Sequence, residues 1–316
     1  MSTSASITAQ VANGVMSVIG SAIGIWLILK FRRRQVLIGD VIGVGFTLLG
    51  IAATFQFFIA PHMANHTTPP TWAAYLILGL MSVFMLIVQA PSIANNAAPG
   101  QFVEIRILHS AFTLRRAFGI VAADRSNGSI AFIYRVVGRG TRALSKLKKG
   151  DVVNLLGPLG NSFSMGYAHP LIVGGGMGLS PLFFYAAAMQ GKADILMGGR
   201  TKEELFWKDL YSGMGEIFIT TDDGSLGKKG FVTEYLSELL SAGKYDGVVV
   251  CGPEIMMKNV AKLAKEHDVP CLVSLEKRMA CGLGACLSCS IDTLNGRKKV
   301  CKDGPVFSAE EVFYSV

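Results

Sequence analysis

Four cysteines near the carboxyl end constrain this chain more than any other feature. Cys281, Cys286 and Cys289 follow a C-x4-C-x2-C spacing, and Cys301 comes after eleven further residues. This is the plant-type spacing for a [2Fe–2S] cluster, to which one loop supplies three thiolates and a separate segment the fourth. Two glycines in the first gap allow positive φ values, which bring backbone amides close to the sulfurs. Zinc is the alternative, but zinc motifs usually pair cysteines in two short arms. The spacing therefore predicts an iron–sulfur cluster.

Cysteine usage and charge limit the classes of protein to which the chain can belong. All six cysteines lie at or after position 251, so a secreted disulfide framework is not expected and the cluster region should face a reducing cytosol. The net charge is +8, but no nucleic-acid motif accompanies it. We therefore expect no nucleic-acid partner, and we ascribe the charge to membrane orientation, anionic cofactors and solvated surface.

Residues 1–82 are far more apolar than an ordinary soluble domain. The whole chain is 51% hydrophobic with a mean hydropathy of +0.43, and apolar runs occupy residues 15–29, 36–60 and 72–88. Runs near 20 residues are long enough to cross a bilayer. Three arginines at 32–34 follow the first run, whereas in a signal peptide they would precede it. The pattern predicts two transmembrane helices, or three, with the arginine loop and the carboxy-terminal region on the cytoplasmic side.

The third apolar run has a second interpretation. Residues 83–88, followed by 101–107, also read as two strands around a loop, in which case only two membrane spans remain. Further strand-like runs at 130–137 and 152–156 are separated by glycine-rich turn signals. Closely spaced short strands predict a small antiparallel sandwich or barrel.

After His169 the pattern changes to alternating strands and helices, which predicts a doubly wound α/β parallel sheet. Ligands of such sheets bind at the carboxyl ends of the strands. A glycine run from Gly174 to Gly178 lies at the first such end and opens a helix, where amides and the helix dipole can hold a pyrophosphate. The same run could be a tight turn with no ligand. The expected strands are 171–173, 194–197, 216–221, 248–251 and 271–275, and the expected helices are 180–190, 231–240 and 253–266.

Several motifs occur in the order seen in one family. They lie at 115–120, 133–141, 157–160, 174–181, 221–227, 251–253 and 281–305. Over about residues 83–316 the chain resembles the electron-transfer subunits of NAD-dependent dihydroorotate dehydrogenase, a branch of the ferredoxin-reductase-like flavoproteins. The resemblance implies three regions: 83–167, an FAD-binding β-barrel; 168–274, an NAD-binding domain; and 275–316, the cluster-binding region. Residues 1–82, apolar and predicted from their hydropathy to be transmembrane, form a fourth region outside the resemblance.

The resemblance also implies which residues meet each cofactor. The family's flavin motif has proline and serine where this chain has Ala117 and Gly119, which removes a hydroxyl near the reactive flavin nitrogen. Cys251 matches a position beside the nicotinamide, or is a buried core residue. The matching FAD positions are Arg116, Ala117, Phe118, Gly119, Ile133, Tyr134, Arg135, Gly140 and Thr141. The matching NAD positions are Gly174, Gly175, Gly176, Met177 and Gly178.

By resemblance, an FMN-containing catalytic subunit oxidises dihydroorotate for pyrimidine biosynthesis, and electrons pass through [2Fe–2S] and FAD to NAD. The two subunits would form a heterotetramer, with the cluster loop around residues 283–288 facing the partner. The apolar first 82 residues favour an alternative, a membrane-bound NAD(P)H oxidoreductase with a quinone, ferredoxin or sulfur-compound partner. A third interpretation, from another class, is a structural or regulatory module with an incidental metal site.

Three smaller features leave their interpretation open. Arg200 could meet the 2′-phosphate of NADP or be solvated. The sequence Asp222-Asp223-Gly224 resembles an acidic metal or ribose site, although a turn after a strand uses the same residues and is favoured. His62 and His66 have the spacing of a metal pair on a helix, but they lie in a proline-rich loop without a further ligand.

Overall fold

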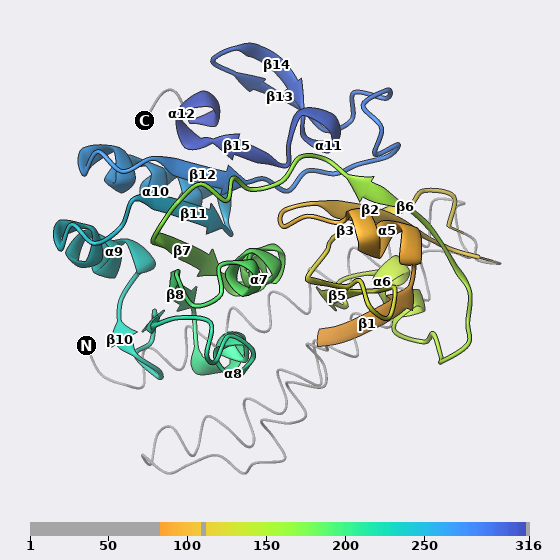
Figure 1. Ribbon diagram of the computed structural model, residues 1–316, viewed down its shortest axis with the longest axis horizontal. Coiled ribbons are helices and arrows are strands. Elements are labelled where there is room, and N and C mark those ends of the chain that lie inside the picture. Colours follow the sequence, from red (N-terminus) through yellow and green to blue (C-terminus); the bar gives the residue numbers. More distant parts are fainter. Residues whose placement is uncertain (1–82, 109–111, 314–316) are drawn as a thin grey trace, which may run out of the picture. The chain divides into compact units, whose positions relative to one another are not determined.

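The computed structural model describes residues 83–108 and 112–313, which form one compact unit (Figure 1). The membrane spans expected within residues 1–82 lie outside the described residues, as do His62 and His66. The end of the third apolar run is a strand, β1 (Val83–Gln89), so its interpretation as a helix up to residue 88 is wrong. None of the helices in the described part combines the length and apolar character that a bilayer crossing requires.

The first part of this unit is a small antiparallel barrel made of two three-stranded sheets. One sheet has the order β1-β5-β4 and the other β3-β2-β6. Alternate residues of β2 and β5, among them Val103, Ile105, Ile130 and Phe132, point into one apolar core, as the two-residue period of a strand requires. The elements are β2 (Phe102–Ile107), β3 (Arg116–Gly119), β4 (Ala122–Asp124), β5 (Ser129–Arg135), β6 (Val153–Leu159), α5 (Pro91–Asn96) and α6 (Arg139–Leu144).

The second part is a seven-stranded sheet in the order β10-β9-β8-β7-β11-β12-β15. All neighbours pair in parallel except β12 and β15, which confirms the doubly wound topology. The antiparallel edge strand comes from the region predicted to bind only the cluster. The elements are β7 (Pro170–Gly175), β8 (Asp194–Gly199), β9 (Ile217–Thr221), β10 (Lys228–Lys229), β11 (Gly247–Cys251), β12 (Cys271–Ser274), β15 (Val306–Ser308), α7 (Leu179–Ala188), α8 (Trp207–Leu210), α9 (Val232–Ser241) and α10 (Glu254–Glu266).

Helices cover both faces of this sheet (Figure 1). Leu171 and Val173 of β7 belong to the core under α9 and α10, whereas Ile172 between them belongs to the core under α7 and α8. Strands buried on both faces read as continuous apolar runs. This is why the sequence of β7 shows no alternation.

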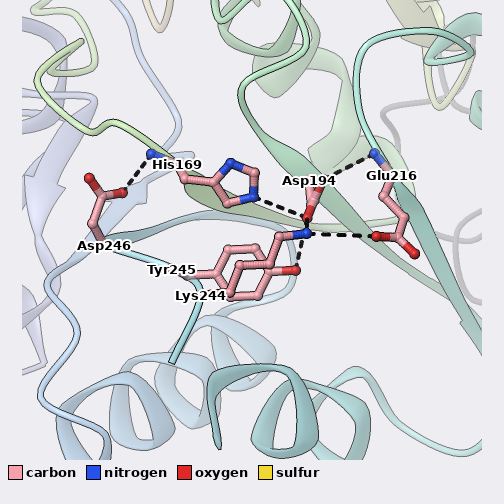
Figure 2. Close-up of polar contacts among 6 residues, drawn as sticks. All are labelled: His169, Asp194, Glu216, Lys244, Tyr245 and Asp246. Carbon is pink, nitrogen blue, oxygen red and sulfur yellow. Dashed lines mark hydrogen bonds and ion pairs between the residues drawn. The ribbon is translucent and has the colours of Figure 1, made fainter. Parts of the chain in front are cut away.

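A polar cluster ties together the end of the sheet opposite the glycine run (Figure 2). The carboxylate of Asp194, only 4% exposed, accepts hydrogen bonds from Lys244 Nζ at 2.6 Å and Tyr245 Oη at 3.0 Å, and lies 3.2 Å from His169 Nε2. The backbone amide of Glu216 donates to its other oxygen at 3.1 Å. Burial alone would raise the pKa of Asp194, but these donors, led by Lys244, lower it.

Replacing Asp194 by alanine should lower the free energy of unfolding by about 3 kcal/mol, because the donors around this buried carboxylate lose their acceptor. The loss is not larger, because the Lys244 ammonium stays partly hydrated. Urea unfolding measures this difference. Since the folded-state pKa is depressed, the wild-type advantage should be complete above the ordinary carboxyl pKa of about 4 and fade as the pH falls below it. Glu216→Ala removes an exposed partner of Lys244 and should cost under about 1 kcal/mol. Equal losses in the two variants would contradict this assignment.

The carboxy-terminal segment returns to the barrel after leaving the sheet. It carries a hairpin, β13 (Ser290–Thr293) and β14 (Gly296–Lys299), followed by α11 (Val300–Asp303), β15 and α12 (Ala309–Val312). Asn161, just after β6, donates from Nδ2 to the carbonyl of Val306 at 2.7 Å and accepts from the Val306 amide at 3.0 Å. The barrel and the segment with the last cysteine are therefore held together by paired hydrogen bonds.

Candidate functional site

A cleft of about 1060 Å³ opens where the barrel meets the α/β sheet. Its barrel wall is formed by β3, β5 and the turn into α6, and its far wall by the start of α7 and the segment after β12. Eight of the nine predicted flavin residues line it: Arg116, Ala117, Phe118, Gly119, Ile133, Tyr134, Arg135 and Thr141.

The ninth residue, Gly140, lies beneath Arg116 and is absent from the cleft wall. A Cβ at Gly140 would come within 2.4 Å of Arg116 Nε, so this glycine lets the arginine side chain lie flat along α6. The guanidinium also stacks over the ring of Phe112, 4.6 Å from its centroid, and donates to the carbonyl of Leu114. These contacts hold one cation at the rim of the cleft.

Two more features make the cleft suitable for a pyrophosphate. The Nε of Arg135 is buried and has no hydrogen-bond partner among the described residues, although buried donors are normally satisfied. The hydroxyl of Thr141 accepts from the amides of Val137 and Gly138 and so fixes the turn that leads from β5 into α6 at the cleft wall. The residues present therefore fit an anionic dinucleotide such as FAD.

Gly119 is explained by packing against the α/β domain. A Cβ there would lie 3.3 Å from Cβ of Pro181 in α7, and the adjacent Ser180 hydroxyl donates to the carbonyl of Ile133 in β5 at 3.1 Å. The chain thus has a close contact between domains where the family motif has a serine. Sequence reasoning did not identify Ser180, because a serine at a helix start is ordinary.

A second cleft, of about 800 Å³, lies at the carboxyl ends of the parallel strands. Gly175, Gly176, Met177 and Gly178 line it, and Gly176 to Gly178 form a short 3-10 turn, η2, that leads into α7. Gly174 faces inward instead, where a Cβ would meet Leu179 at 2.3 Å. The glycine run therefore combines close packing with an open helix start that can accept a phosphate.

The far end of this cleft carries two carboxylates. Glu204, in η3 (Lys202–Leu205), accepts from the Arg200 amide at 3.0 Å and from its Nε and Nη2 at 3.0 and 2.6 Å. Burial would raise the pKa of Glu204, but the Arg200 donors outweigh it and lower that pKa. Asp222 lines the same cleft, whereas Asp223 binds Ser225 within a turn. The turn that the sequence favoured for Asp222-Asp223-Gly224 is thus present, and Asp222 faces the cleft.

The two clefts share three lining residues, Arg135, Met177 and Glu276. The Glu276 side chain is exposed to the space of the two clefts. The surrounding protein nevertheless keeps part of the solvent away from its carboxylate, and this desolvation raises its pKa. Sequence reasoning missed this residue, because its position after a strand carries no distinctive pattern. Cys251 lies outside both linings, 1% exposed, and burial raises the pKa of its thiol. The structure thus places Cys251 in the core.

The loop after β12 carries Cys281, Cys286 and Cys289, and α11 places the fourth predicted cluster cysteine, Cys301, beside it. The amides of Cys286 and Leu283 donate to Cys281 Sγ, each at 3.4 Å, and lower its pKa to about 6. The Gly284 amide donates to Cys301 Sγ at 3.2 Å, and the Cys301 amide donates to Cys289 Sγ at 3.4 Å. Amides that point at sulfur stabilise thiolates, the form that binds metal.

The thiols are arranged in two neighbouring pairs, Cys281 with Cys286 and Cys289 with Cys301. Across the described residues, no three His, Cys, Asp or Glu side chains converge closely enough for a single ion. Two pairs suit a two-iron cluster, in which each iron takes two thiolates. Gly282 and Gly284 have φ values of +67° and +81°, the positive angles expected of this loop.

Comparisons with known proteins agree with this geometry. The family described as the iron-sulfur cluster binding domain of dihydroorotate dehydrogenase B matches residues 276–313, and the oxidoreductase FAD-binding domain family matches residues 81–163. The dihydroorotate dehydrogenase B (NAD(+)) electron transfer subunit of Clostridium acetobutylicum is 41% identical over 217 residues, 68% of this chain and 85% of that relative. The subunit of the same name from Desulforamulus reducens is 40% identical over 236 residues, 71% and 90% of the two chains.

Solved structures share the fold. An NADH-dependent reduced ferredoxin-NADP oxidoreductase is 35% identical, with a TM-score of 0.67 over 73% of this chain and 84% of the other. A ferredoxin reductase of carbazole 1,9a-dioxygenase is 23% identical, with a TM-score of 0.50 over 60% and 62%. The fold is thus that of ferredoxin-reductase-like flavoproteins with a carboxy-terminal iron–sulfur region, and the chain belongs to the family of dihydroorotate dehydrogenase B electron transfer subunits.

Proposed function

We propose that this protein carries electrons between a partner subunit that oxidises dihydroorotate at FMN and the nicotinamide nucleotide NAD. When bound, FAD would exchange a hydride with NAD, and the [2Fe–2S] cluster would pass single electrons to and from the partner. Arg116 and Arg135 would hold the FAD pyrophosphate, and Gly175 to Gly178 that of NAD. Cys281, Cys286, Cys289 and Cys301 would ligate the iron.

The observation that carries this proposal is the continuity of the two clefts and the cysteine loop. The flavin cleft shares Arg135, Met177 and Glu276 with the nucleotide cleft, and its wall includes Met279, Ala280 and Ser288 of the cluster segment. Between the cysteines of the loop, Leu283 and Leu287 are 59% and 60% exposed. Exposed leucines beside a cluster support docking of a partner subunit at this loop.

Reconstitution tests the proposal. Purified protein mixed with an FMN-containing dihydroorotate-oxidising subunit should reduce NAD in a dihydroorotate-dependent reaction and form a complex of both chains, expected as a heterotetramer. Failure of both outcomes, with FAD and iron present, would contradict the assignment of the partner.

A second candidate is a membrane-associated oxidoreductase that exchanges electrons with ferredoxin or a quinone. The 35% identity to an NADH-dependent reduced ferredoxin-NADP oxidoreductase and the apolar residues 1–82 favour it. The same purified protein would then reduce ferredoxin or a quinone with NADH and would need no dihydroorotate-oxidising subunit.

For either function we propose that residues 1–82 attach the chain to a membrane, with the cofactor-binding region on the cytoplasmic side. The support is the sequence: apolar runs at 15–29 and 36–60, separated by the arginines at 32–34. Fractionation and a carbonate wash test this proposal. Release of the intact chain into the supernatant would contradict it.

The carboxylates of Glu204 and Asp222 should make the protein prefer NADH to NADPH. Glu204 occupies the donors of Arg200 that would otherwise meet a 2′-phosphate, and both carboxylates would repel that group. Glu204→Gln should therefore raise NADPH affinity relative to NADH about tenfold, which corresponds to about 1.4 kcal/mol. Titration of flavin reduction with each nucleotide measures the ratio.

Glu203→Gln is the matched control, since Glu203 is exposed and does not line the cleft. It should leave the nucleotide preference unchanged. If the wild-type protein binds NADPH as tightly as NADH, the carboxylates do not discriminate.

A further inference from the structure

A buried acidic side chain in the barrel belongs to none of the sites described above. Glu104, in the middle of β2, is 0% exposed, and neither of its carboxyl oxygens has a hydrogen-bond partner among the described residues. Its neighbours Val103 and Ile105 point into the barrel core. Because side chains alternate along a strand, Glu104 points out of the barrel.

The cluster loop covers this side chain. A Cβ on Gly282 would lie 2.9 Å from Cγ and 3.1 Å from Oε1 of Glu104, so the carboxyl packs directly against the residue that follows Cys281. Across the sheet, Glu104 pairs with Ala117 of β3, which lines the flavin cleft. Glu104 therefore lies between the flavin wall and the cluster loop.

The surroundings favour the neutral form of this acid. The neighbouring Arg115 donates to the backbone carbonyl of Glu104 at 3.4 Å and to Asn154, but not to the Glu104 carboxylate. Burial raises the pKa of Glu104, and Arg115 offsets only part of that rise. A buried carboxylate without a partner is costly, whereas a neutral acid can donate one hydrogen bond.

We propose that Glu104 is a positioning residue of the cluster site: in the cluster-bound protein its carboxyl group, which has no other partner among the described residues, donates a hydrogen bond to the loop at Gly282 and thereby raises the cluster's reduction potential. The proposal rests on the proposed function, because it requires a bound cluster. Hydrogen bonds and burial around the sulfurs set the potential of such clusters, and outer-shell groups orient the ligands. A donor stabilises the reduced cluster, which carries the additional negative charge.

Two substitutions of Glu104 separate hydrogen bonding from packing. Glu104→Gln keeps a donor of the same shape, and Glu104→Leu fills the space without one. In an EPR-monitored redox titration of the purified holoprotein, Glu104→Leu should lower the ratio of reduced to oxidised cluster at least tenfold at a fixed potential. For a one-electron couple that is about 59 mV. Glu104→Gln should stay within threefold of the wild-type protein.

Controls keep the outcome decisive. Glu266→Leu, at the exposed end of α10, should leave the potential unchanged. If Glu104→Leu does not retain iron, the near-isosteric pair Glu104→Thr and Glu104→Val repeats the comparison of a donor with no donor. Equal potentials in the Leu and Gln variants, or in the Thr and Val variants, would overturn the proposal. A wild-type protein without a cluster would instead overturn the proposed function.

Discussion

Replacing Cys286 by serine should abolish the [2Fe–2S] cluster and electron exchange with the partner, while FAD stays bound. Cys286 is the exposed member of one thiol pair, and serine is a poor iron ligand at neutral pH because its hydroxyl stays protonated. Partner-dependent activity should fall more than about a hundredfold, since outer-shell changes alone cost about 10- to 100-fold. NADH-driven reduction of a dye that accepts electrons directly from FAD should persist.

Cys271→Ser is the matched control for this substitution. Cys271 is the first residue of β12 and is buried in the core, away from the cluster loop. Its replacement should therefore change stability and leave the iron content intact. Iron analysis and the visible spectrum compare the two variants. A Cys286→Ser protein with full iron content, or equal iron loss from both variants, would show that the loop does not hold the cluster.

Replacing Arg116 by alanine should weaken FAD binding about 10- to 100-fold, because one charge-assisted hydrogen bond contributes about 1.5–3 kcal/mol. The guanidinium is positioned at the cleft rim by Phe112 and Gly140, so little side-chain entropy remains to be lost when a phosphate binds. The FAD dissociation constant of the deflavinated protein measures the effect.

Arg125→Ala serves as the control for Arg116→Ala. Arg125 lies exposed in the turn between β4 and β5, away from the cleft lining. Its removal lowers the net charge by the same amount but should leave FAD affinity unchanged. Comparable weakening in both variants would mean that overall positive charge, rather than the position of Arg116, attracts the cofactor.

Much of the fold was predictable because its signals are local. The apolar runs of β7, β8 and β11 and the glycine run after β7 predicted the parallel sheet, and short strands separated by glycine turns predicted the barrel. The cysteine spacing predicted a loop whose thiols converge. Residues 83–88 could be interpreted as the end of a helix or as a strand. They form a strand because they pair with β5, and no local sequence pattern specifies that pairing.

The remaining features depend on contacts between distant segments. The sequence does not indicate that β15 joins the sheet beside β12, that Glu204 engages Arg200, or that Glu104 faces Gly282. A glutamate on a strand of alternating residues ordinarily points to solvent, but the returning cluster loop packs against this one at Gly282. Gly140 and Gly174 were expected at the cofactors, and nothing in the sequence indicates that each also makes room for a neighbouring side chain, Arg116 and Leu179 respectively.

Anaerobic titration with NADH tests the central claim, that a single chain connects a nicotinamide site, a flavin and an iron–sulfur cluster. Flavin absorbance and the EPR signal of the cluster are followed in the same sample of the purified protein. The relay predicts that NADH bleaches the flavin and that a reduced [2Fe–2S] signal appears without any partner. A bleached flavin beside a fully iron-loaded but EPR-silent, oxidised cluster would contradict it.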